Sequence, residues 1–218
     1  MLYIVSTPIG NLGDITFRAV DTLKRCNLIV AEDTRRTGIL LNKYDIKTNM
    51  ISYNDHNKKR RIPYLIKLLK ENNDISLVSD AGTPGISDPG YNLINECIDS
   101  EIQVVPIPGP SAAISALVTS GLPTDSYVFY GFLPKKEKKK KELLLSLKRT
   151  MVFYESPHRI KKTLKHMDEV IPGAKVCLAR EMTKKFEEFL RGTPSEILKA
   201  TKDKNIKGEI VLIVNNKD

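Results

Sequence analysis

The sequence has little cysteine, no tryptophan and only three histidines. Cys26, Cys97 and Cys177 lie far apart, without a C-x-x-C pair or clustered histidines, which argues against a disulfide framework and a structural zinc site. We expect buried thiols and no bound metal. Apolar runs stay well short of the ~20 residues that span a bilayer. We therefore expect no association with a membrane.

The stock nucleotide-binding motifs are also missing. The sequence contains no G-x-x-x-x-G-K-[ST], and no G-x-G-x-x-G follows an expected strand. An ordinary P-loop or dinucleotide-binding domain is therefore excluded.

The composition is that of a soluble globular protein. Of 218 residues, 41% are hydrophobic and 28% are charged, enough for one large core or two modest ones. The first residues, Met1–Val5, have neither a basic region nor a long apolar stretch, so we expect no signal peptide and a cytoplasmic location.

The net charge of +9 lies entirely in the second half of the chain. Residues 1–110 carry 13 basic and 13 acidic side chains, whereas residues 111–218 carry 22 and 13. A positive surface attracts polyanions and favours nucleic acid as the partner. The alternative is a lysine-rich surface that is only solvated.

The first half alternates expected strands with expected helices. Short β-branched runs at 2–6, 28–31, 75–79 and 103–107 predict buried strands. Helical patterns occupy 15–25, 34–43, 63–71, 89–99 and 110–119. This alternation predicts an α/β domain with a mostly parallel sheet covered by helices.

The rhythm changes after the turn cluster Gly121–Asp125, where we expect a domain boundary. The predicted domains are 1–120 and 121–218. Strands expected at 127–133, 151–154, 176–179 and 209–214 alternate with basic helices and predict a mixed sheet. Asp88-Pro89, Ser156-Pro157 and the capping box Thr193–Glu196 predict helix starts.

Three loops rich in glycine and proline follow strands of the first domain, at 7–14, 80–90 and 106–113. The carboxyl ends of parallel strands share one edge of a sheet, where ligands bind in open α/β folds. Glycine lets the backbone approach a ligand and proline stiffens the loop. The loops predict a binding crevice; the alternative is that each is only a tight turn.

Six stretches together resemble a known family: 7–16 (TPIGNLGDIT), 32–35 (EDTR), 79–90, 131–134 (GFLP), 154–159 (YESPHR) and 180–184 (REMTK). In this order they are similar to ribosomal RNA small-subunit methyltransferase I, a family of 2′-O-methyltransferases that act on a cytidine of 16S rRNA. The resemblance covers Tyr3 to Val214. It implies a two-domain tetrapyrrole-methylase-like fold, S-adenosylmethionine as cofactor, a homodimer, and small-subunit rRNA or the assembled 30S subunit as partner.

The resemblance also implies the cofactor-binding residues. In the predicted first domain they are Pro8, Asp80, Ala81, Gly82, Thr83, Ser111 and Ala112. Tyr154 and Glu155 are the expected contacts in the second half. Relatives that modify tetrapyrroles have a hydrophobic residue in place of Glu155, and Val78-Ser79-Asp80 replaces their glycine loop. Both departures favour RNA as the substrate.

The chemistry can be reasoned from the residues themselves. A ribose hydroxyl attacks a sulfonium methyl group, so alignment supplies much of the rate and a base that accepts the hydroxyl proton adds to it. His56, Asp88, Glu155, Glu181 and Lys184 are candidates, Lys184 on condition that its pKa is lowered. We select Glu181, His56 and Lys184 as catalytic residues. The alternative for His56 is a solvated side chain.

Basic residues near these motifs are the expected RNA contacts: Arg35, Lys58, Lys59, Arg60, Arg61, Lys138, Lys139 and Arg159. Lysine and arginine contacts to phosphates position RNA without reading its sequence. For the run 135–141 the alternative is simple solvation. Apolar residues of the first-half helices are expected to supply the centre of a dimer interface: Ile39, Leu40, Leu41, Leu65, Ile66, Leu68 and Leu69.

Three functions follow. The favoured one is S-adenosylmethionine-dependent 2′-O-methylation of a cytidine ribose in 16S rRNA. The second is a tetrapyrrole (precorrin-type) methyltransferase of the same fold, and the third is an RNA-binding factor without catalysis. The cofactor loops argue against the third, and the basic second half argues against the second.

Overall fold

The computed structural model describes residues 1–146 and 148–216, so Leu147 and the end of the predicted second domain, 217–218, lie outside it. The chain forms two compact units, Met1–Ser111 and Ala112–Asp218. Helix α5 (Ala112–Thr119) packs against strands β7 (Thr150–Glu155) and β10 (Ile210–Asn215). It therefore belongs to the second unit, and the division lies earlier than the boundary we predicted after residue 120.

The first unit is a parallel α/β unit, as predicted. Its strands are β1 (Leu2–Val5), β2 (Leu28–Ala31), β3 (Met50–Ser52), β4 (Ile75–Val78) and β5 (Val104–Ile107). They form one sheet in the order β3-β2-β4-β1-β5, with every pair parallel. Between them lie the 3-10 helix η1 (Leu12–Asp14) and α1 (Phe17–Arg25), α2 (Thr34–Lys43), α3 (Lys58–Lys70) and α4 (Gly90–Asp99).

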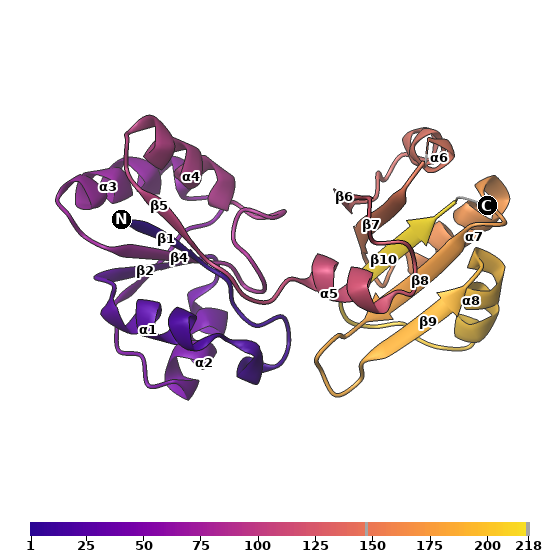
Figure 1. Ribbon diagram of the computed structural model, residues 1–218, viewed down its shortest axis with the longest axis horizontal. Coiled ribbons are helices and arrows are strands. Elements are labelled where there is room, and N and C mark those ends of the chain that lie inside the picture. The colour runs from indigo at the N-terminus through magenta and orange to yellow at the C-terminus, as the bar shows by residue number, and fades with distance from the viewer. Residues whose placement is uncertain (147, 217–218) are drawn as a thin grey trace. The chain divides into compact units, whose positions relative to one another are not determined.

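Helices cover both faces of this sheet. Leu65 of α3 and Leu93 of α4 pack in one buried cluster with Leu77 of the sheet. Leu23 of α1 and Leu41 of α2 belong to a second cluster, and Figure 1 shows these two pairs of helices on opposite sides of the strands. A sheet buried on both faces explains why its strands read as continuous apolar runs.

The second unit is built on a mixed sheet, also as predicted. Its strands are β6 (Tyr127–Phe132), β7, β8 (Lys175–Arg180), β9 (Glu188–Gly192) and β10, in the order β6-β7-β10-β8-β9. The β6–β7 pair is parallel and the other pairs are antiparallel. The remaining helices are α6 (Glu137–Leu145), α7 (Ile160–Val170) and α8 (Pro194–Thr201).

A buried cluster joins three helices of this unit to its sheet. Leu144 of α6, Leu164 of α7 and Ile197 of α8 pack with Phe153 and Leu212 of the central strands. The predicted capping box is present at the start of α8, where Thr193 accepts the Glu196 amide and the Glu196 carboxylate accepts the Thr193 amide. No helix within 1–146 and 148–216 is both long and apolar enough to span a bilayer.

Three local predictions differ from the structure. Helix α3 starts at Lys58, earlier than expected, and includes Pro63. The helix expected after Ser156-Pro157 begins at Ile160, because the Ser156 carbonyl first accepts the Arg159 amide in a turn. Strands β3 and β9 were not predicted: β3 has only three residues, and both lie at sheet edges, half-buried, where the apolar pattern is weak.

Candidate functional site

The loops after β1 and β4 are joined at the carboxyl edge of the first sheet. Thr7 and Gly82 exchange two backbone hydrogen bonds, of 2.9 and 3.0 Å. Ser6 Oγ lies 2.8 Å from Thr83 Oγ1, and Thr7 Oγ1 donates to the Ser79 carbonyl at 3.1 Å. The fold therefore brings together the expected cofactor-binding residues Pro8, Asp80, Ala81, Gly82 and Thr83.

Glycine is required at two places in these loops. Gly82 has φ of +81°, a conformation that side chains with a Cβ rarely adopt. A Cβ on Gly109, in the loop after β5, would lie 2.9 Å from Ser6 Cβ, too close without movement of the backbone. The contacts of Gly82 with Thr7 and of Gly109 with Ser6 therefore bring the three predicted loops together at one edge of the sheet.

Two carboxylates lie beside the β4 loop. Asp80 Oδ1 accepts the Asp33 amide at 3.0 Å, and Asp80 Oδ2 lies 3.3 Å from Arg36 Nη1. Glu32, at the end of β2, accepts the Asp80 amide through Oε2 at 3.3 Å. Burial raises the pKa of Asp80, and although Arg36 lowers it the net direction is upward. Burial also raises the pKa of Glu32, and the charge of Asp80 adds to it.

Glu32 was missed as a site residue. It belongs to the quoted EDTR stretch, but its place directly after a buried strand was the signal that could have singled it out. Ionisable groups whose pKa is shifted by burial and by neighbouring charges cluster at functional sites. Glu32 and Asp80 fit that description at the edge where the three loops meet.

Asp88 has a structural role in the same loop. Its Oδ1 accepts the Gly85 amide at 2.6 Å and the Gly90 amide at 2.9 Å. A Cβ on Gly90 would lie 2.9 Å from the Gly85 nitrogen. Asp88 therefore holds the loop before α4 in place by hydrogen bonds to Gly85 and Gly90. The sequence predicted a helix start at Pro89 with Asp88 as the cap, whereas α4 begins at Gly90.

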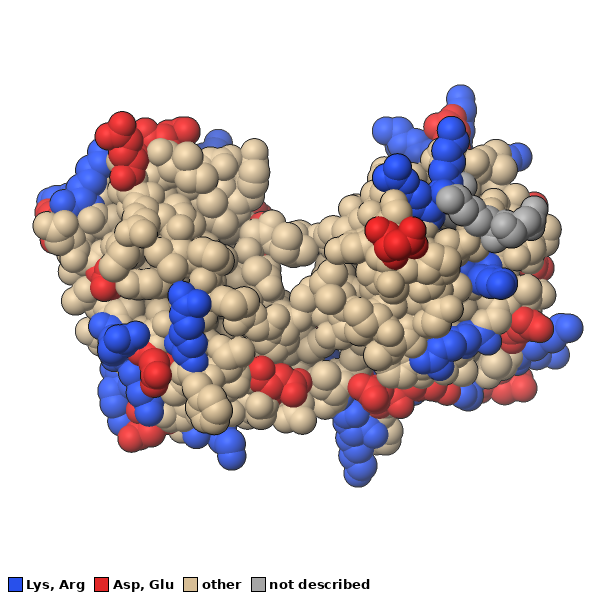
Figure 2. Space-filling view, viewed as in Figure 1, with Lys and Arg blue, Asp and Glu red and all other residues tan. Residues whose placement is uncertain are grey.

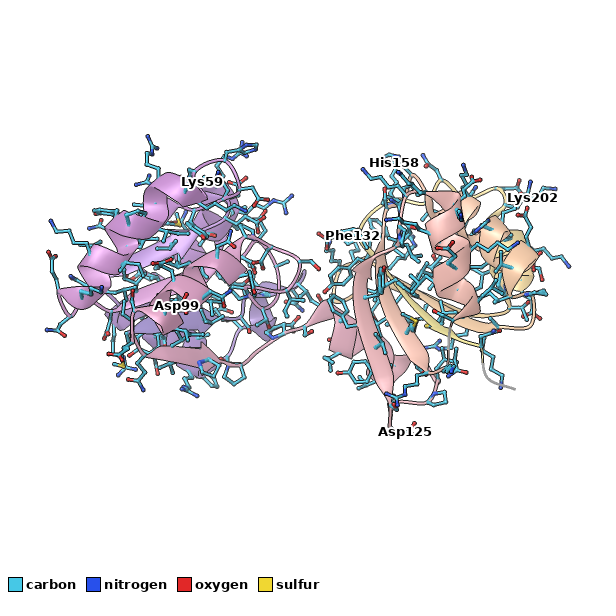
Figure 3. The ribbon with its side chains drawn as sticks, turned by 90° about the horizontal axis from the view of Figure 1, so that it is seen from above. Lys59, Asp99, Asp125, Phe132, His158 and Lys202 are labelled. Atoms are coloured by element: carbon cyan, nitrogen blue, oxygen red, sulfur yellow. The ribbon has the colours of Figure 1, made fainter. Side chains whose placement is uncertain are left out.

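The expected basic contacts of the first unit stand at helix starts. Arg35 is exposed and makes an ion pair of 2.7 Å with Asp33. Lys58 makes an ion pair with Asp55, while Lys59 is exposed and Figure 3 shows it at the surface of this unit. The remaining members are Arg60, exposed, and Arg61, half-buried.

His56 lies in the turn that precedes α3. Its side chain is exposed, and its amide donates to Asn54 Oδ1 at 3.1 Å. Among the described residues the His56 ring has no hydrogen bond that would orient it as a base. The solvated alternative thus agrees with its surroundings.

Glu155 is turned into the second unit. Its buried carboxylate accepts the Ser156 amide at 2.7 Å, Thr163 Oγ1 at 2.7 Å and Arg159 Nη2 at 3.0 Å. Lys140 Nζ donates to Thr163 Oγ1 at 3.3 Å. We call Glu155, Arg159, Thr163 and Lys140 the Glu155 cluster. With its oxygens occupied inside the protein, Glu155 has a structural role here in place of the side-chain contact to cofactor that we expected.

The Glu155 cluster also changes the interpretation of the basic residues. Arg159 donates to the Leu133 carbonyl at 2.9 Å as well as to Glu155. It therefore links residues 131–134 to the start of α7. Lys140 is 4% exposed, and burial lowers its pKa although Glu155 raises it. Lys138 and Lys139 are exposed, and Figure 2 shows basic side chains gathered over α6. The lysine run is therefore partly buried and partly surface.

The prediction that the pKa of Lys184 is lowered is wrong. Burial lowers it, but hydrogen bonds to Glu181 Oε1 at 2.9 Å and Glu209 Oε2 at 3.0 Å outweigh burial, and the net direction is upward. Lys184 therefore stays protonated and cannot accept a proton. The pKa of Glu181 is lowered, because Lys184 and the Glu209 amide outweigh the effect of burial.

The last three expected cofactor contacts lie where the chain passes into the second unit and within it. Ser111 closes the first unit and Ala112 opens α5. Tyr154 is half-buried in β7, and its ring packs against Phe129 and Phe132 with centroids 5.2 and 5.7 Å apart.

Comparison with known proteins identifies the family to which the chain is similar. The sequence pattern of the tetrapyrrole (corrin/porphyrin) methylases matches residues 1–198. The chain is 51% identical over 216 residues to ribosomal RNA small subunit methyltransferase I of Halalkalibacterium halodurans, covering 98% of this chain and 75% of that protein. It is 50% identical over 220 residues to the protein of the same name from Thermotoga maritima, covering 100% and 99%.

Solved structures agree on the fold. A cobalt precorrin-4 methyltransferase has a TM-score of 0.73 at 15% identity, covering 98% of this chain and 94% of that one. Uroporphyrin-III C-methyltransferase from Thermus thermophilus, solved with S-adenosyl homocysteine, has a TM-score of 0.67 at 14% identity, covering 98% and 96%. At such identities the likeness shows the fold alone. On the sequence matches, the chain belongs to the tetrapyrrole (corrin/porphyrin) methylase family and, within it, to the branch of the ribosomal RNA small subunit methyltransferase I proteins.

Proposed function

We propose that the protein transfers a methyl group from S-adenosylmethionine to the 2′-oxygen of a cytidine ribose in 16S rRNA, acting in the cytoplasm. The observation that carries this proposal is about 50% identity over nearly the whole chain to proteins named for small-subunit rRNA methylation. The tetrapyrrole enzymes that share the fold are 14–17% identical. An rRNA substrate is therefore favoured over a tetrapyrrole.

The residues at the carboxyl edge of the first sheet fit this cofactor. The loops that contain Gly82 and Gly109 meet at this edge, and the half-buried carboxylates of Glu32 and Asp80 can accept hydrogen bonds from the hydroxyl and ammonium groups of S-adenosylmethionine. Pro8, Ala81 and Thr83 would line the site within the first unit. When bound, the cofactor supplies an electrophilic methyl group on a sulfonium.

The remaining chemistry belongs to the protein and the RNA. Holding the ribose hydroxyl in line with the methyl group removes an entropic cost that is worth up to ~7–11 kcal/mol in well-oriented reactions. Glu181 and His56 stay the candidates for the proton acceptor. The ionised Glu181 carboxylate can accept a proton at neutral pH, but its pairing with Lys184 weakens it as a base.

A direct experiment tests the reaction. Small subunits from a strain that lacks ribose methylation are incubated with the purified protein and S-adenosylmethionine, and the 16S rRNA is mapped by mass spectrometry. We expect one added methyl group, on a cytidine ribose. Methylation of a base, of 23S rRNA or of a tetrapyrrole supplied in parallel would contradict the proposal. Free 16S rRNA in a second arm identifies the form of the substrate.

We further propose that the protein acts as a homodimer that enlarges the RNA-binding surface. The predicted centre of the interface needs correction, because Leu40, Leu41, Leu65, Ile66 and Leu69 are buried in the core. Leu68 is partly buried against the same core, which leaves Ile39, at 63% exposed, as the surface residue of that set. Light scattering tests the dimer: a mass near 24.6 kDa for active enzyme would exclude it.

A further inference from the structure

A groove on the second unit is rich in basic side chains. It has a volume of about 450 Å³ and runs between the residues before and within the first turn of α7 and the segment that follows α8. Asp203 and Asn205 complete its lining. We call it the basic groove; its other lining residues are Pro157, His158, Lys161, Lys202, Lys204 and Ile206.

The groove is braced by one of its own lysines. Lys161 Nζ donates to the Lys202 carbonyl at 2.8 Å, which ties α7 to the segment after α8. An ammonium has three donors, so two remain for a ligand. Lys204 is different, because its Nζ makes an ion pair of 2.6 Å with Glu188 Oε1.

Two further donors in the groove have no protein partner. Across the part of the chain that the structure describes, neither the His158 ring nor the Lys202 ammonium makes a hydrogen bond or an ion pair. Both side chains are exposed, and Figure 3 shows them at the surface of the second unit. Lys161, Lys202 and His158 therefore offer donors to anionic groups that lie along the groove.

The start of α7 adds to the positive potential. A helix carries about half a positive charge at its N-terminus, and α7, which begins at Ile160, is 11 residues long. Pro157 and His158 precede that start, and Lys161 lies in the first turn. The dipole and the ammonium groups thus favour negative charge in the same groove.

A second groove provides a comparison. It has a volume of about 730 Å³ and lies between α3 and α4, with Lys67 and Lys70 among its lining. Glu71 and Glu96 are in the same lining, and Lys67 Nζ lies 4.0 Å from Glu71 Oε1. Among the described lining residues of the second groove, Glu71 and Glu96 offset two of three lysines, Lys59 being the third, whereas the basic groove has three lysines and one carboxylate, that of Asp203.

We propose that the basic groove binds backbone phosphate of the RNA substrate through Lys161, Lys202 and His158. This inference rests on the proposed function, which supplies a polyanion as substrate. Contacts of this kind hold RNA in register and read no sequence. The groove is thus a positioning site for the substrate within the second unit.

The test compares Lys161→Gln/Lys202→Gln with the matched control Lys67→Gln/Lys70→Gln, which removes the same charge from the second groove. Affinity for labelled 16S rRNA is measured by fluorescence anisotropy between about 50 and 200 mM salt. We expect the basic-groove variant to bind at least tenfold more weakly. Its slope of log K against log[salt] should fall by about 0.7 to 0.9 for each phosphate that the variant no longer binds. The control should behave as wild type.

A second pair of variants separates the contact with phosphate from the hydrogen bond between Lys161 and the Lys202 carbonyl. Lys161→Arg keeps the charge and should keep the salt slope, while His158→Gln/Lys202→Gln leaves the Lys161 brace intact and should still lower it. Equal salt slopes for wild type, Lys161→Gln/Lys202→Gln and His158→Gln/Lys202→Gln would overturn the inference. So would groove amide shifts with inorganic phosphate alongside an unchanged slope for RNA, since the groove would then hold small anions.

The outcome for the groove is separable from the outcome for the proposed function. If wild type methylates 16S rRNA and the groove variants bind RNA normally, the inference fails and the proposed function stands. If wild type transfers no methyl group to RNA, the proposed function fails. Calorimetry with S-adenosylmethionine should give the same affinity for all variants, which shows that the first unit is intact.

Discussion

The two units hold certain partly buried carboxylates in opposite ways, at one site in each. In the first unit, which has balanced charge, burial raises the pKa of Glu32 and Asp80 at the edge of the sheet. In the second, which carries the whole net charge of +9, the pKa of Glu188 is lowered by hydrogen bonds from Lys204 and Arg180. Ionising Glu32 or Asp80 costs free energy, at the edge where a ligand would bind. The ionised Glu188 carboxylate instead stabilises the second unit through its ion pairs.

The largest expected effect is on the stability of the second unit. Glu155→Ala leaves Arg159 and Lys140 without their buried counter-charge, and losing one partner of a buried pair costs about 3–5 kcal/mol. We expect the free energy of unfolding of this unit to fall by that amount, measured by hydrogen exchange of α7 amides in urea. Glu137→Ala, which removes the exposed ion pair with Lys162, is the control and should change little. Similar losses in both variants would contradict the structural role of Glu155.

The next effect is on cofactor binding in the first unit. Gly82→Val places a branched side chain at φ of +81°, in the loop that faces the expected ligand. We expect S-adenosylmethionine binding to be lost in calorimetry. Gly121→Val is matched in backbone strain, at φ of +76° with no atom within 4 Å of the added Cβ. If Gly121→Val also abolishes binding, the loss comes from strain and the assignment of the loop fails.

A smaller loss is expected for the carboxylate beside this loop. Asp80→Ala removes the acceptor of the Asp33 amide and the acceptor that we propose for the ligand, so we expect roughly tenfold weaker binding of S-adenosylmethionine. The circular dichroism spectrum should stay unchanged. Asp45→Ala, which removes an exposed ion pair with Lys47, is the control. Unchanged affinity in Asp80→Ala would remove this residue from the site.

The comparison also predicts opposite responses to pH. The pKa of Glu188 is lowered in the folded state, so its stabilisation is present above the ordinary value of 4.5 and is lost as pH falls through the lowered pKa. The pKa of Glu32 is raised from 4.5, so ionising it destabilises the first unit as pH rises through the folded pKa. Hydrogen exchange from about pH 6 down to pH 3 should therefore show the second unit weakening relative to the first.

Single variants sharpen the pH prediction. Glu32→Gln should raise the free energy of unfolding of the first unit at neutral pH, and Glu188→Gln should flatten the acid dependence of the second. Parallel pH profiles for the two units in wild type would contradict the contrast between them.

The smallest effect concerns the lysine run on α6. Lys138→Gln/Lys139→Gln removes two exposed charges and should lower the salt slope of RNA binding by about 0.7 to 0.9 for each phosphate that is released. Lys140→Met removes a charge that is buried in the Glu155 cluster and should leave the slope unchanged. An equal decrease in both variants would show that sequence position, and not exposure, decides which lysines bind RNA.

Much of the fold could be predicted because its signals are local. The buried strands of the first sheet read as apolar runs, Thr193 and Glu196 form a capping box within four residues, and the loops containing Gly82 and Gly109 follow predicted strands directly. The parallel arrangement of the first sheet follows from the alternation of strand and helix. The resemblance in turn supplied the cofactor, which local physics could not identify.

What failed depends on contacts between distant residues. The pKa of Lys184 is raised by Glu181, three residues earlier, and by Glu209, 25 residues away along the chain. Lys140 is buried because Glu155 and Thr163 lie opposite it. Helix α5 continues the alternation of the first half but packs on strands formed far later in the sequence. Such partners cannot be read from a window of sequence, because tertiary packing creates them.

Strand β10 has a consequence for how the protein is made. It pairs with both β7 and β8, so the middle of the second sheet is formed by residues 210–215. During synthesis the first unit has all its strands once residue 107 has left the ribosome, whereas β7 and β8 must wait with unpaired edges until residue 215 appears. Exposed strand edges invite wrong pairing. A ribosome that stalls before residue 210 would therefore release a chain with a finished first unit and an aggregation-prone second one, a target for chaperones.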